Sequence, residues 1–321
     1  MLAGKEPTMT HILTLTFNPA LDISTTVPHI QPSHKLRCTH PVVHPGGGGI
    51  NVARVLKRLG ADVRAVLPSG GPTGASLVRL LQHEEVPLHV VPISQDTRES
   101  FSAVATDTGE EYRFVLPGPT LRAPEWQACL DACLSGQPAY LVASGSLCPG
   151  MPDDTYALLA EPCRAQGTRL VVDSSGPALQ AALKAGVFLF KPSLRELKEL
   201  TGAPLSTTRE QLDACRGLIQ TGQAEIVALT LGEAGAMVVS AQEAWMSPAL
   251  PVAVHSTIGA GDSFVAGLVW SLAQGEPLRD AFRLAMAASA AALAAQGTAL
   301  CDPADALSWR GQVQPQALAP A

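Results

Sequence analysis

Charged residues are scarce in this chain of 321 residues. They make up 16% of the sequence, whereas about a quarter is typical of a soluble domain. There is no basic excess either, because 28 acidic residues stand against 22 basic ones and the formal net charge is −6. A protein that binds nucleic acid usually carries a basic excess to neutralise phosphates. We therefore expect no nucleic-acid partner.

The chain also lacks the cysteine patterns of a disulfide framework or a metal site. Its seven cysteines are scattered and include no Cys-x-x-Cys pair, which suits reduced, buried thiols. No apolar run reaches the ~20 residues that a membrane span needs. The nearest, residues 284–295, is Ala-rich and predicts a buried helix. The first apolar run, residues 12–17, is too short and too polar for a signal peptide. We expect a cytoplasmic protein without a membrane partner.

Short apolar runs alternate with helical patterns along most of the chain, and 46% of the residues are hydrophobic, enough for a large core. Strands are predicted at residues 12–17, 63–67, 140–143, 170–172, 188–190 and 226–229. Helices are predicted at residues 50–59, 74–81, 153–166, 209–220 and 262–273. Such alternation predicts an α/β fold with a mostly parallel sheet that helices flank on both faces.

Two stretches interrupt this alternation. Residues 24–43 carry β-type residues between prolines, and residues 101–115 form two strand patterns around the turn signal Asp107-Thr108-Gly109. Together they predict a small antiparallel sheet that projects from the α/β body. From the pattern alone, this sheet could be a lid over a site or an edge decoration.

A run of four glycines, residues 46–49, leads directly into the helical pattern that contains Asn51. Glycines allow a ligand to approach the backbone closely, and a helix start offers unpaired N–H groups. The alternative is a flexible loop before a helix. Four consecutive glycines cost chain entropy, so we favour a binding role.

A second glycine-rich turn, Gly259-Ala260-Gly261-Asp262, also precedes a helical pattern. Such a turn favours anions, because its N–H groups and the helix dipole both point at the ligand. Asp262 would be either an ordinary first-turn carboxylate or a general base beside a phosphate cradle. A dinucleotide fingerprint is disfavoured, because the turn lies near the C-terminus and mostly helix follows it. Phosphate-loop, protein-kinase and Gly-x-Ser-x-Gly motifs are absent from the sequence.

Three segments resemble, in order, the signatures of the PfkB sugar kinases of the ribokinase superfamily. They are residues 18–22 (Asn-Pro-Ala-Leu-Asp), 46–54 and 257–262. The resemblance implies a single kinase domain over residues 10–310 with a Rossmann-like ribokinase fold. It also implies a small antiparallel β lid, near residues 23–44 and 99–116, through which two subunits form a homodimer.

Residues 35–38, 111–115 and 172–176 are similar to those of family members that act on fructose 6-phosphate. The resemblance then implies an enzyme of glycolysis that uses ATP to phosphorylate the C1 hydroxyl of D-fructose 6-phosphate, giving fructose 1,6-bisphosphate. Members that act on fructose 1-phosphate or tagatose 6-phosphate usually carry Lys in place of Gly48. A kinase for one of those phosphosugars stays open as an alternative. So does a catalytically weakened regulator that binds a sugar phosphate.

The resemblance assigns a sugar side to the site, which comprises Asp22, Lys35, Gly47, Gly48, Gly49, Asn51, Arg98 and Ser146. Of these, Asp22 would bind sugar hydroxyls. Arg98 and Ser146 would lie near the sugar phosphate, and Lys35 would reach it from the partner subunit. Cations suit that place, because a sugar phosphate carries about two negative charges.

The nucleotide side implied by the resemblance comprises Lys191, Ser193, Arg195, Thr230, Gly232 and Gly235. The catalytic turn comprises Gly259, Ala260, Gly261 and Asp262, with Asp262 as the base and the turn amides facing the transferred phosphoryl group. Glu196 would help to hold Mg²⁺ through water. Ser256, Ile258 and Gly297 resemble a K⁺ site.

The sequence departs from the family pattern at three positions. Ser193 stands where the Asn-x-x-Glu motif begins with Asn, and Ala295 and Ala299 replace an Asn and an Arg near the K⁺ region. The first change bears on the affinity for ATP or Mg²⁺, and the other two bear on activation by K⁺.

Overall fold

The computed structural model describes residues 11–295, 297 and 299–318. A ten-stranded sheet runs through the body in the order β14-β13-β12-β11-β10-β9-β8-β1-β4-β5. Seven of its strands are parallel: β1 (Ile12–Leu15), β4 (Val63–Ser69), β5 (Leu88–Pro92), β8 (Tyr140–Ser144), β9 (Arg169–Asp173), β10 (Val187–Phe190) and β11 (Ala224–Thr230). Three antiparallel strands extend one edge: β12 (Ala236–Ser240), β13 (Ala244–Ser247) and β14 (Gln316–Ala317). The predicted mostly parallel α/β architecture is confirmed.

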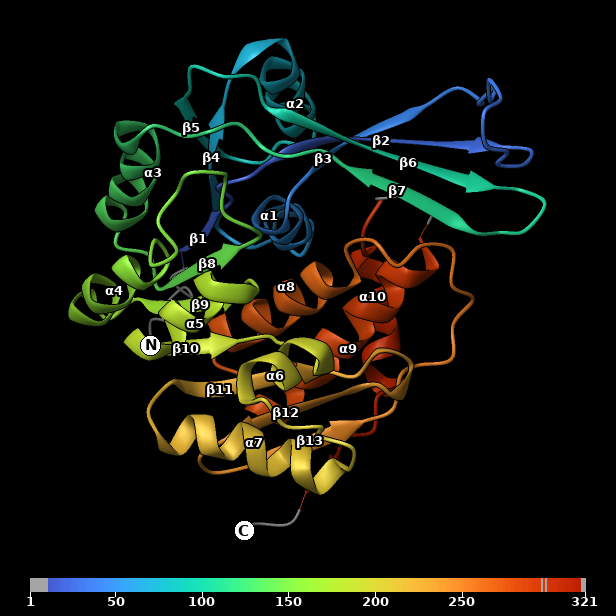
Figure 1. The fold of residues 1–321 in the computed structure, drawn as a ribbon. Helices are drawn as coiled ribbons and strands as arrows, with labels where there is room; N and C mark the ends of the chain where they lie inside the picture. The colour runs from blue at the N-terminus through green and yellow to red at the C-terminus, as the bar shows by residue number, and fades with distance from the viewer. Residues whose placement is uncertain (1–10, 296, 298, 319–321) are drawn as a thin grey trace, which may run out of the picture.

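Helices cover both faces of this sheet (Figure 1). One face packs against α1 (Gly48–Arg58), α2 (Gly71–His83), α8 (Ala260–Ala273), α9 (Leu278–Ala294) and α10 (Pro303–Trp309). The other packs against α3 (Ala123–Ser135), α4 (Ala160–Gln166), α5 (Gly176–Ala185), α6 (Leu194–Thr201) and α7 (Thr208–Gln220). Along β1, Ile12 belongs to the first core and Leu13 to the second, as strand alternation requires. The Ala-rich helix α9 is buried, as its sequence predicts.

The predicted helix over residues 153–166 is shorter than expected. Only η1 (Ala157–Leu159) and α4 are helical there. Pro162 has no N–H to close a bond back to Leu158, so it is tolerated only in the first turn of a helix. The α-helix accordingly begins at Ala160, which places Pro162 in that turn.

A second sheet of four strands projects from the body as a lid, in the order β3-β2-β6-β7 (Figure 1). Its strands are β2 (Ala20–Val27), β3 (Val42–Gly46), β6 (Arg98–Ala105) and β7 (Glu111–Val115). The predicted hairpin of β6 and β7 is confirmed, and Gly109 in its turn has φ 73°. The sheet is mixed rather than antiparallel, because β2 and β6 pair in parallel. These two strands both leave the body at their first residues, and helices and strands of the body separate them in the chain, so no tight turn forces an antiparallel pairing.

The register of the lid separates two kinds of side chain. Val43, Ile23, Phe101 and Phe114 pair in one row across the four strands, and the Phe101 and Phe114 rings lie 6.3 Å apart. Asp22, one position along β2, points to the opposite face. The lid thus carries an apolar face and a polar face.

Among the described residues, no helix is both long enough and apolar enough to cross a lipid bilayer. All seven cysteines are free thiols, and every one except Cys38 is buried.

Candidate active site

The glycine run connects the lid to α1. Gly47 is the N-cap of α1 and has φ 119°, a backbone conformation that residues other than glycine rarely adopt. A Cβ on Gly48 would overlap Ser144 Oγ, and a Cβ on Gly49 would lie 2.6 Å from the carbonyl oxygen of Leu15. The glycines therefore let α1 begin directly against the carboxyl ends of β1 and β8.

A cavity of about 290 Å³ lies between this run, the carboxyl ends of the main sheet and the base of the lid. It brings together nine predicted residues: Asp22, Gly47, Gly48, Asn51, Arg98, Ser146, Glu196, Gly259 and Asp262. Ile258 of the predicted K⁺ site also lines it. Gly49 is buried behind the cavity, where its small size serves packing. We call this space the sugar-side cavity.

Cations surround the lid carboxylate of the sugar-side cavity. Burial raises the pKa of Asp22, and the charges of Arg113, Arg98 and Arg54 oppose that rise. Arg98 donates to the carbonyl oxygens of Leu116 and Asn18, both at 3.1 Å, and its Nε is buried without a hydrogen-bond partner. The cavity therefore offers cations to an anionic group while Asp22 remains available to hydroxyls.

Two charged residues that line the sugar-side cavity were not predicted as site residues. Arg113 comes from β7 of the lid, and Asp173 ends β9. Strand alternation could have placed Arg113 opposite the apolar Phe114. Asp173 could have been found as a carboxylate at the carboxyl end of a buried parallel strand, where α/β sheets bind ligands.

Asp262 lies in the first turn of α8, a helix that begins directly after its N-cap Gly259, which has the αL conformation. The side-chain nitrogen Nδ2 of Asn51 donates to Asp262 Oδ2 at 2.8 Å. Burial, reinforced by the nearby Asp173 carboxylate, raises the pKa of Asp262 to about 6. A carboxylate with that pKa is ionised at neutral pH and still accepts a proton readily, as a general base must.

A buried ion pair lies behind the same turn. Lys191 Nζ is 3.2 Å from Asp173 Oδ1, and a Cβ built on Gly261 would lie 3.6 Å from Lys191 Nζ. Burial would lower the pKa of Lys191, but Asp173, Glu196 and Asp262 together raise it. The ammonium group therefore stays charged behind the backbone of the turn.

A second cavity, of about 780 Å³, lies on the other side of the catalytic turn. It gathers the predicted nucleotide-side residues Ser193, Arg195, Thr230, Gly232 and Gly235. Its walls are mostly apolar and include Val252, Val254, Phe264, Met286 and Leu293. We call it the nucleotide-side cavity. Gly235 has φ 102°, and a Cβ there would overlap the backbone of Ser247, so glycine is required.

The catalytic turn separates the two cavities. Gly259 and Asp262 face the sugar-side cavity, whereas Ala260 and Gly261 face the nucleotide-side cavity. A group passing from one cavity to the other would therefore pass this turn.

Ser193 and Glu196 form a capping box at the start of α6. The backbone nitrogen and the hydroxyl of Ser193 donate to Glu196 Oε2 at 2.7 and 2.8 Å, and the backbone nitrogen of Glu196 donates back to Ser193 Oγ. Serine thus keeps the N-cap role. The arrangement also fixes Glu196 at the edge of the sugar-side cavity.

Four further predicted residues lie outside both cavities. Lys191 is buried behind the turn, and Lys35 is exposed in the loop between β2 and β3. Ser256 is buried, and its hydroxyl accepts from the backbone nitrogen of Ile258 at 3.2 Å. Gly297 lies beyond the end of α9 with φ 56°.

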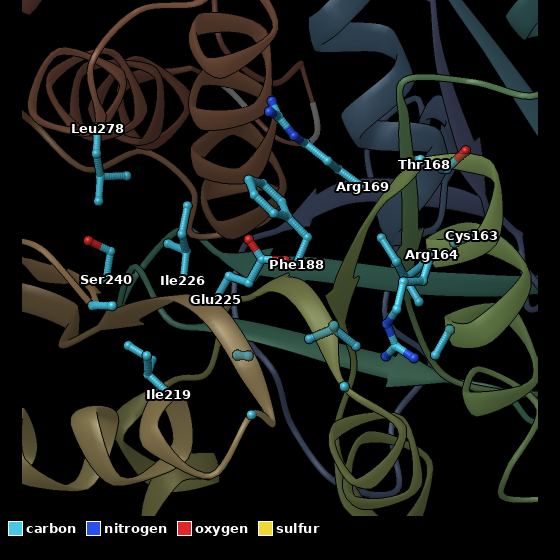
Figure 2. A pocket seen from close by; sticks show the side chains of 18 of the residues that line it. Cys163, Arg164, Thr168, Arg169, Phe188, Ile219, Glu225, Ile226, Ser240 and Leu278 are labelled. Carbon is cyan, nitrogen blue, oxygen red and sulfur yellow. The ribbon is translucent and has the colours of Figure 1, made fainter.

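A third cavity, of about 710 Å³, lies at the amino ends of β9, β10 and β11. Figure 2 shows Arg169, Phe188 and Glu225 in its wall. This edge of the sheet is opposite to Asp173 at the carboxyl end of β9. Because α/β sheets bind their ligands beyond the carboxyl ends of the strands, we place the active site at the other two cavities.

Comparisons with known proteins identify the family of this chain. The model of the pfkB family of carbohydrate kinases matches residues 16–305. The ATP-dependent 6-phosphofructokinase isozyme 2 of Mycobacterium tuberculosis is 45% identical over 296 residues, covering 92% of this chain and 87% of that protein. The crystal structure of phosphofructokinase-2 from Escherichia coli in complex with potassium has a TM-score of 0.91 and 40% identity, covering 95% of this chain and 99% of that one. Its complex with fructose-6-phosphate has a TM-score of 0.89 and 38% identity over the same shares. The chain belongs to the PfkB family of carbohydrate kinases.

Proposed function

We propose that this protein is an ATP-dependent 6-phosphofructokinase, which transfers the γ-phosphoryl group of ATP to the C1 hydroxyl of D-fructose 6-phosphate. The observation that carries the proposal is the turn of residues 259–262, which borders both cavities and presents Asp262 to the smaller one. The similar M. tuberculosis protein is named for this ATP-dependent activity. The similar E. coli enzyme has been crystallised with fructose-6-phosphate. We infer one kinase domain over residues 10–310, with the four-stranded lid as part of it.

Asp262 is the general base in this reaction. Its carboxylate takes the proton of the C1 hydroxyl as that oxygen bonds to the γ-phosphorus, and the bond from phosphorus to the leaving ADP oxygen breaks in line. The backbone N–H groups of Gly259, Ala260 and Gly261 stabilise the transferred phosphoryl oxygens, and Lys191 adds positive charge behind them. Because phosphoryl transfer needs little covalent help, positioning and charge supply most of the rate.

The sugar-side cavity recognises the substrate by charge and by hydroxyl contacts. Arg98, Arg113 and Ser146 bind the 6-phosphate, whose two negative charges match two guanidinium groups. Asp22 and Asn51 bind sugar hydroxyls. The partner subunit's Lys35 supplies a third cation.

Mg²⁺ fits the acidic edge of the sugar-side cavity. Asp173, Glu196 and Asp262 all line it. Burial raises the pKa of Asp173, the Lys191 charge opposes that rise, and the Glu196 carboxylate adds to it. Within the described part of the chain no group of three acidic, His or Cys side chains could hold a metal directly. Glu196 would therefore hold Mg²⁺ through water, with the phosphates of ATP as further ligands. When bound, Mg²⁺ would neutralise phosphate charge.

A K⁺ ion would take carbonyl oxygens of Ser256, Ile258 and Gly297. The backbone nitrogen of His255 donates to the carbonyl oxygen of Leu293 at 2.8 Å, which holds the segment before α8 against the end of α9. The similar E. coli structure was determined in complex with potassium. Because Ala295 and Ala299 stand where relatives carry Asn and Arg, we expect activation by K⁺ to differ from that of those relatives.

We further infer that two copies associate through the apolar face of the lid. Phe114 is 56% exposed, and Phe101 and Val43 are each 37% exposed in the same row. Phe114→Glu should convert the dimer to a monomer in size-exclusion chromatography with light scattering. A wild-type protein that elutes as a monomer would contradict the dimer. The seven unpaired thiols support a reducing compartment, and we place the protein in the cytoplasm.

The function is tested by coupled ADP release with a panel of phosphosugars. Fructose 6-phosphate should give the highest kcat/KM, above fructose 1-phosphate and tagatose 6-phosphate. A higher kcat/KM for either of the other two sugars would overturn the assignment of fructose 6-phosphate as the substrate. Absence of ADP release with all three, from protein that binds ATP, would indicate a regulator instead.

A further inference from the structure

Arg54 is a charged side chain that is buried inside the protein. It is 1% exposed and lies in α1, one turn after Asn51. A buried charge needs a partner, and Glu84 at the end of α2 provides one. Arg54 Nε donates to Glu84 Oε2 at 2.9 Å, and Nη2 donates to Oε1 at 2.7 Å. This two-bond pairing fixes the plane of the guanidinium group.

The remaining nitrogen of that plane points toward the active site. Arg54 Nη1 donates to the carbonyl oxygen of Pro45 at 3.1 Å and to Asn51 Oδ1 at 3.4 Å. Pro45 directly precedes the four glycines. One guanidinium group therefore contacts both the glycine run and the amide that faces Asp262.

The contact with Arg54 decides which way the amide of Asn51 is turned. A guanidinium group has donors only, so Asn51 must present its oxygen to Arg54. Its NH2 group then faces Asp262 and donates to Oδ2 at 2.8 Å. The flipped amide would place NH2 against a cation and oxygen against a carboxylate, and both contacts are repulsive.

We propose that Arg54, held in place by Glu84, is a positioning residue for phosphoryl transfer, because it fixes the amide of Asn51 with its NH2 group toward Asp262. This rests on the proposed function, in which Asp262 is the base. With Asn51 so turned, Oδ2 of Asp262 is held by a donor, and Oδ1 is left to accept the proton. Without Arg54 the amide rotates, and the ionised form of Asp262 loses its hydrogen bond.

Arg54→Met tests the proposal, because Met fills similar space and leaves Glu84 its second partner, Arg58, at 3.1 Å. We expect kcat to fall about tenfold or more, and the acid limb of kcat/KM to move up by about one pH unit. The KM for ATP should change little. The pKa of Asp262, measured by carbon-13 NMR against an Asp262→Asn spectrum, should rise by the same amount.

The double variant Asn51→Ala/Arg54→Met separates positioning from a structural role. If Arg54 acts through Asn51, the second substitution should cause no further loss of kcat and no further pH shift once Asn51 is gone. Additive losses would overturn the proposal. Glu84→Gln, which keeps the shape and loosens the ion pair, should shift the acid limb in the same direction by less. No shift in either Arg54→Met or Glu84→Gln would also overturn it.

Arg310→Met is the matched control. Arg310 makes a similar two-bond pair with Glu276, at 3.2 and 2.6 Å, beyond the far end of α8. Its loss should lower stability without moving the pH profile, and an equal shift there would overturn the proposal. The NMR measurement needs no turnover, so a shifted pKa in a protein inactive on fructose 6-phosphate would refute the proposed function alone.

Discussion

Asp262→Asn should abolish turnover and stabilise the protein at the same time. Asn keeps the shape of the side chain, and its oxygen can still accept from Asn51, but it cannot take a proton. A positioned base contributes about 10²–10⁴-fold, so kcat should fall by at least that factor. The stabilisation comes from the pKa, which burial and the Asp173 charge raise from 3.8 to about 6.

The magnitude follows from the size of that shift. About two pKa units correspond to about 3 kcal/mol of unfavourable free energy for the ionised form in the folded state. Asp262 borders a cavity, and solvent there reduces the penalty, so we expect the variant to gain about 1–3 kcal/mol. The gain depends on pH. In the wild type the penalty is absent below about pH 4, grows as pH rises through 6, and is complete above that.

Thermal or urea unfolding at pH 4 and pH 8, together with coupled ADP release, checks both halves. At pH 8 the unfolding midpoint of the variant should lie at a higher temperature or urea concentration than that of the wild type. At pH 4 the two midpoints should be equal. Asp280→Asn is the control, since Asp280 is also the third residue of its helix but pairs with Arg283 at 3.4 Å on the surface. It should keep full activity and gain no stability. A variant at position 262 with wild-type kcat, or with lower stability at pH 8, would refute the reasoning.

Three further outcomes are expected. In the wild type, kcat/KM should decline below about pH 6 as Asp262 becomes protonated, and a flat profile down to pH 5 would exclude it as the base. Arg98→Ala should raise the KM for fructose 6-phosphate by roughly ten- to a hundredfold, from loss of a charge-assisted contact, with little effect on ATP; equal effects on both substrates would remove Arg98 from the phosphate site. Ser193→Asn should lower the KM for MgATP and leave that for fructose 6-phosphate unchanged, because Asn keeps the N-cap and adds an amide. Weaker MgATP binding in this variant would show that the site is adapted to Ser.

Six parallel strands of the body, β1, β4, β8, β9, β10 and β11, could be predicted because each is a short apolar run in the sequence. The strands β5, β12, β13 and β14 and the helices α3, α5, α6 and α10 were not predicted. The run at residues 63–67 forms the buried part of β4 except for the exposed Arg64, and Gly60, with φ 81°, follows α1 as a stop. Pairing between distant segments leaves no such local signal. The parallel contact of β2 with β6 depends on where the body holds their first residues, which the chain pattern does not encode.

The candidate site divides in the same way. Asn51 and Asp262 stand beside glycine-rich turns, so the sequence could single them out. Arg113 stands in a short strand with nothing unusual beside it, and only the lid's fold brings it to the sugar-side cavity. Arg54 belongs to the signature segment, but its role depends on Glu84, which is 30 residues away in the sequence.

Because β2 and β6 pair in parallel at the centre of the lid, the lid is attached to the body at one end and can rotate about that end. Both central strands leave the body at the same end, where Ala20 lies opposite Arg98. Eight residues of β2 extend about 26 Å from that end. A rotation of about 10° there would carry the far end of the lid about 4–5 Å while moving Asp22 by about 1 Å. Contacts made by Asp22 and Arg98 can therefore persist through a swing that fully repositions the loop carrying Lys35.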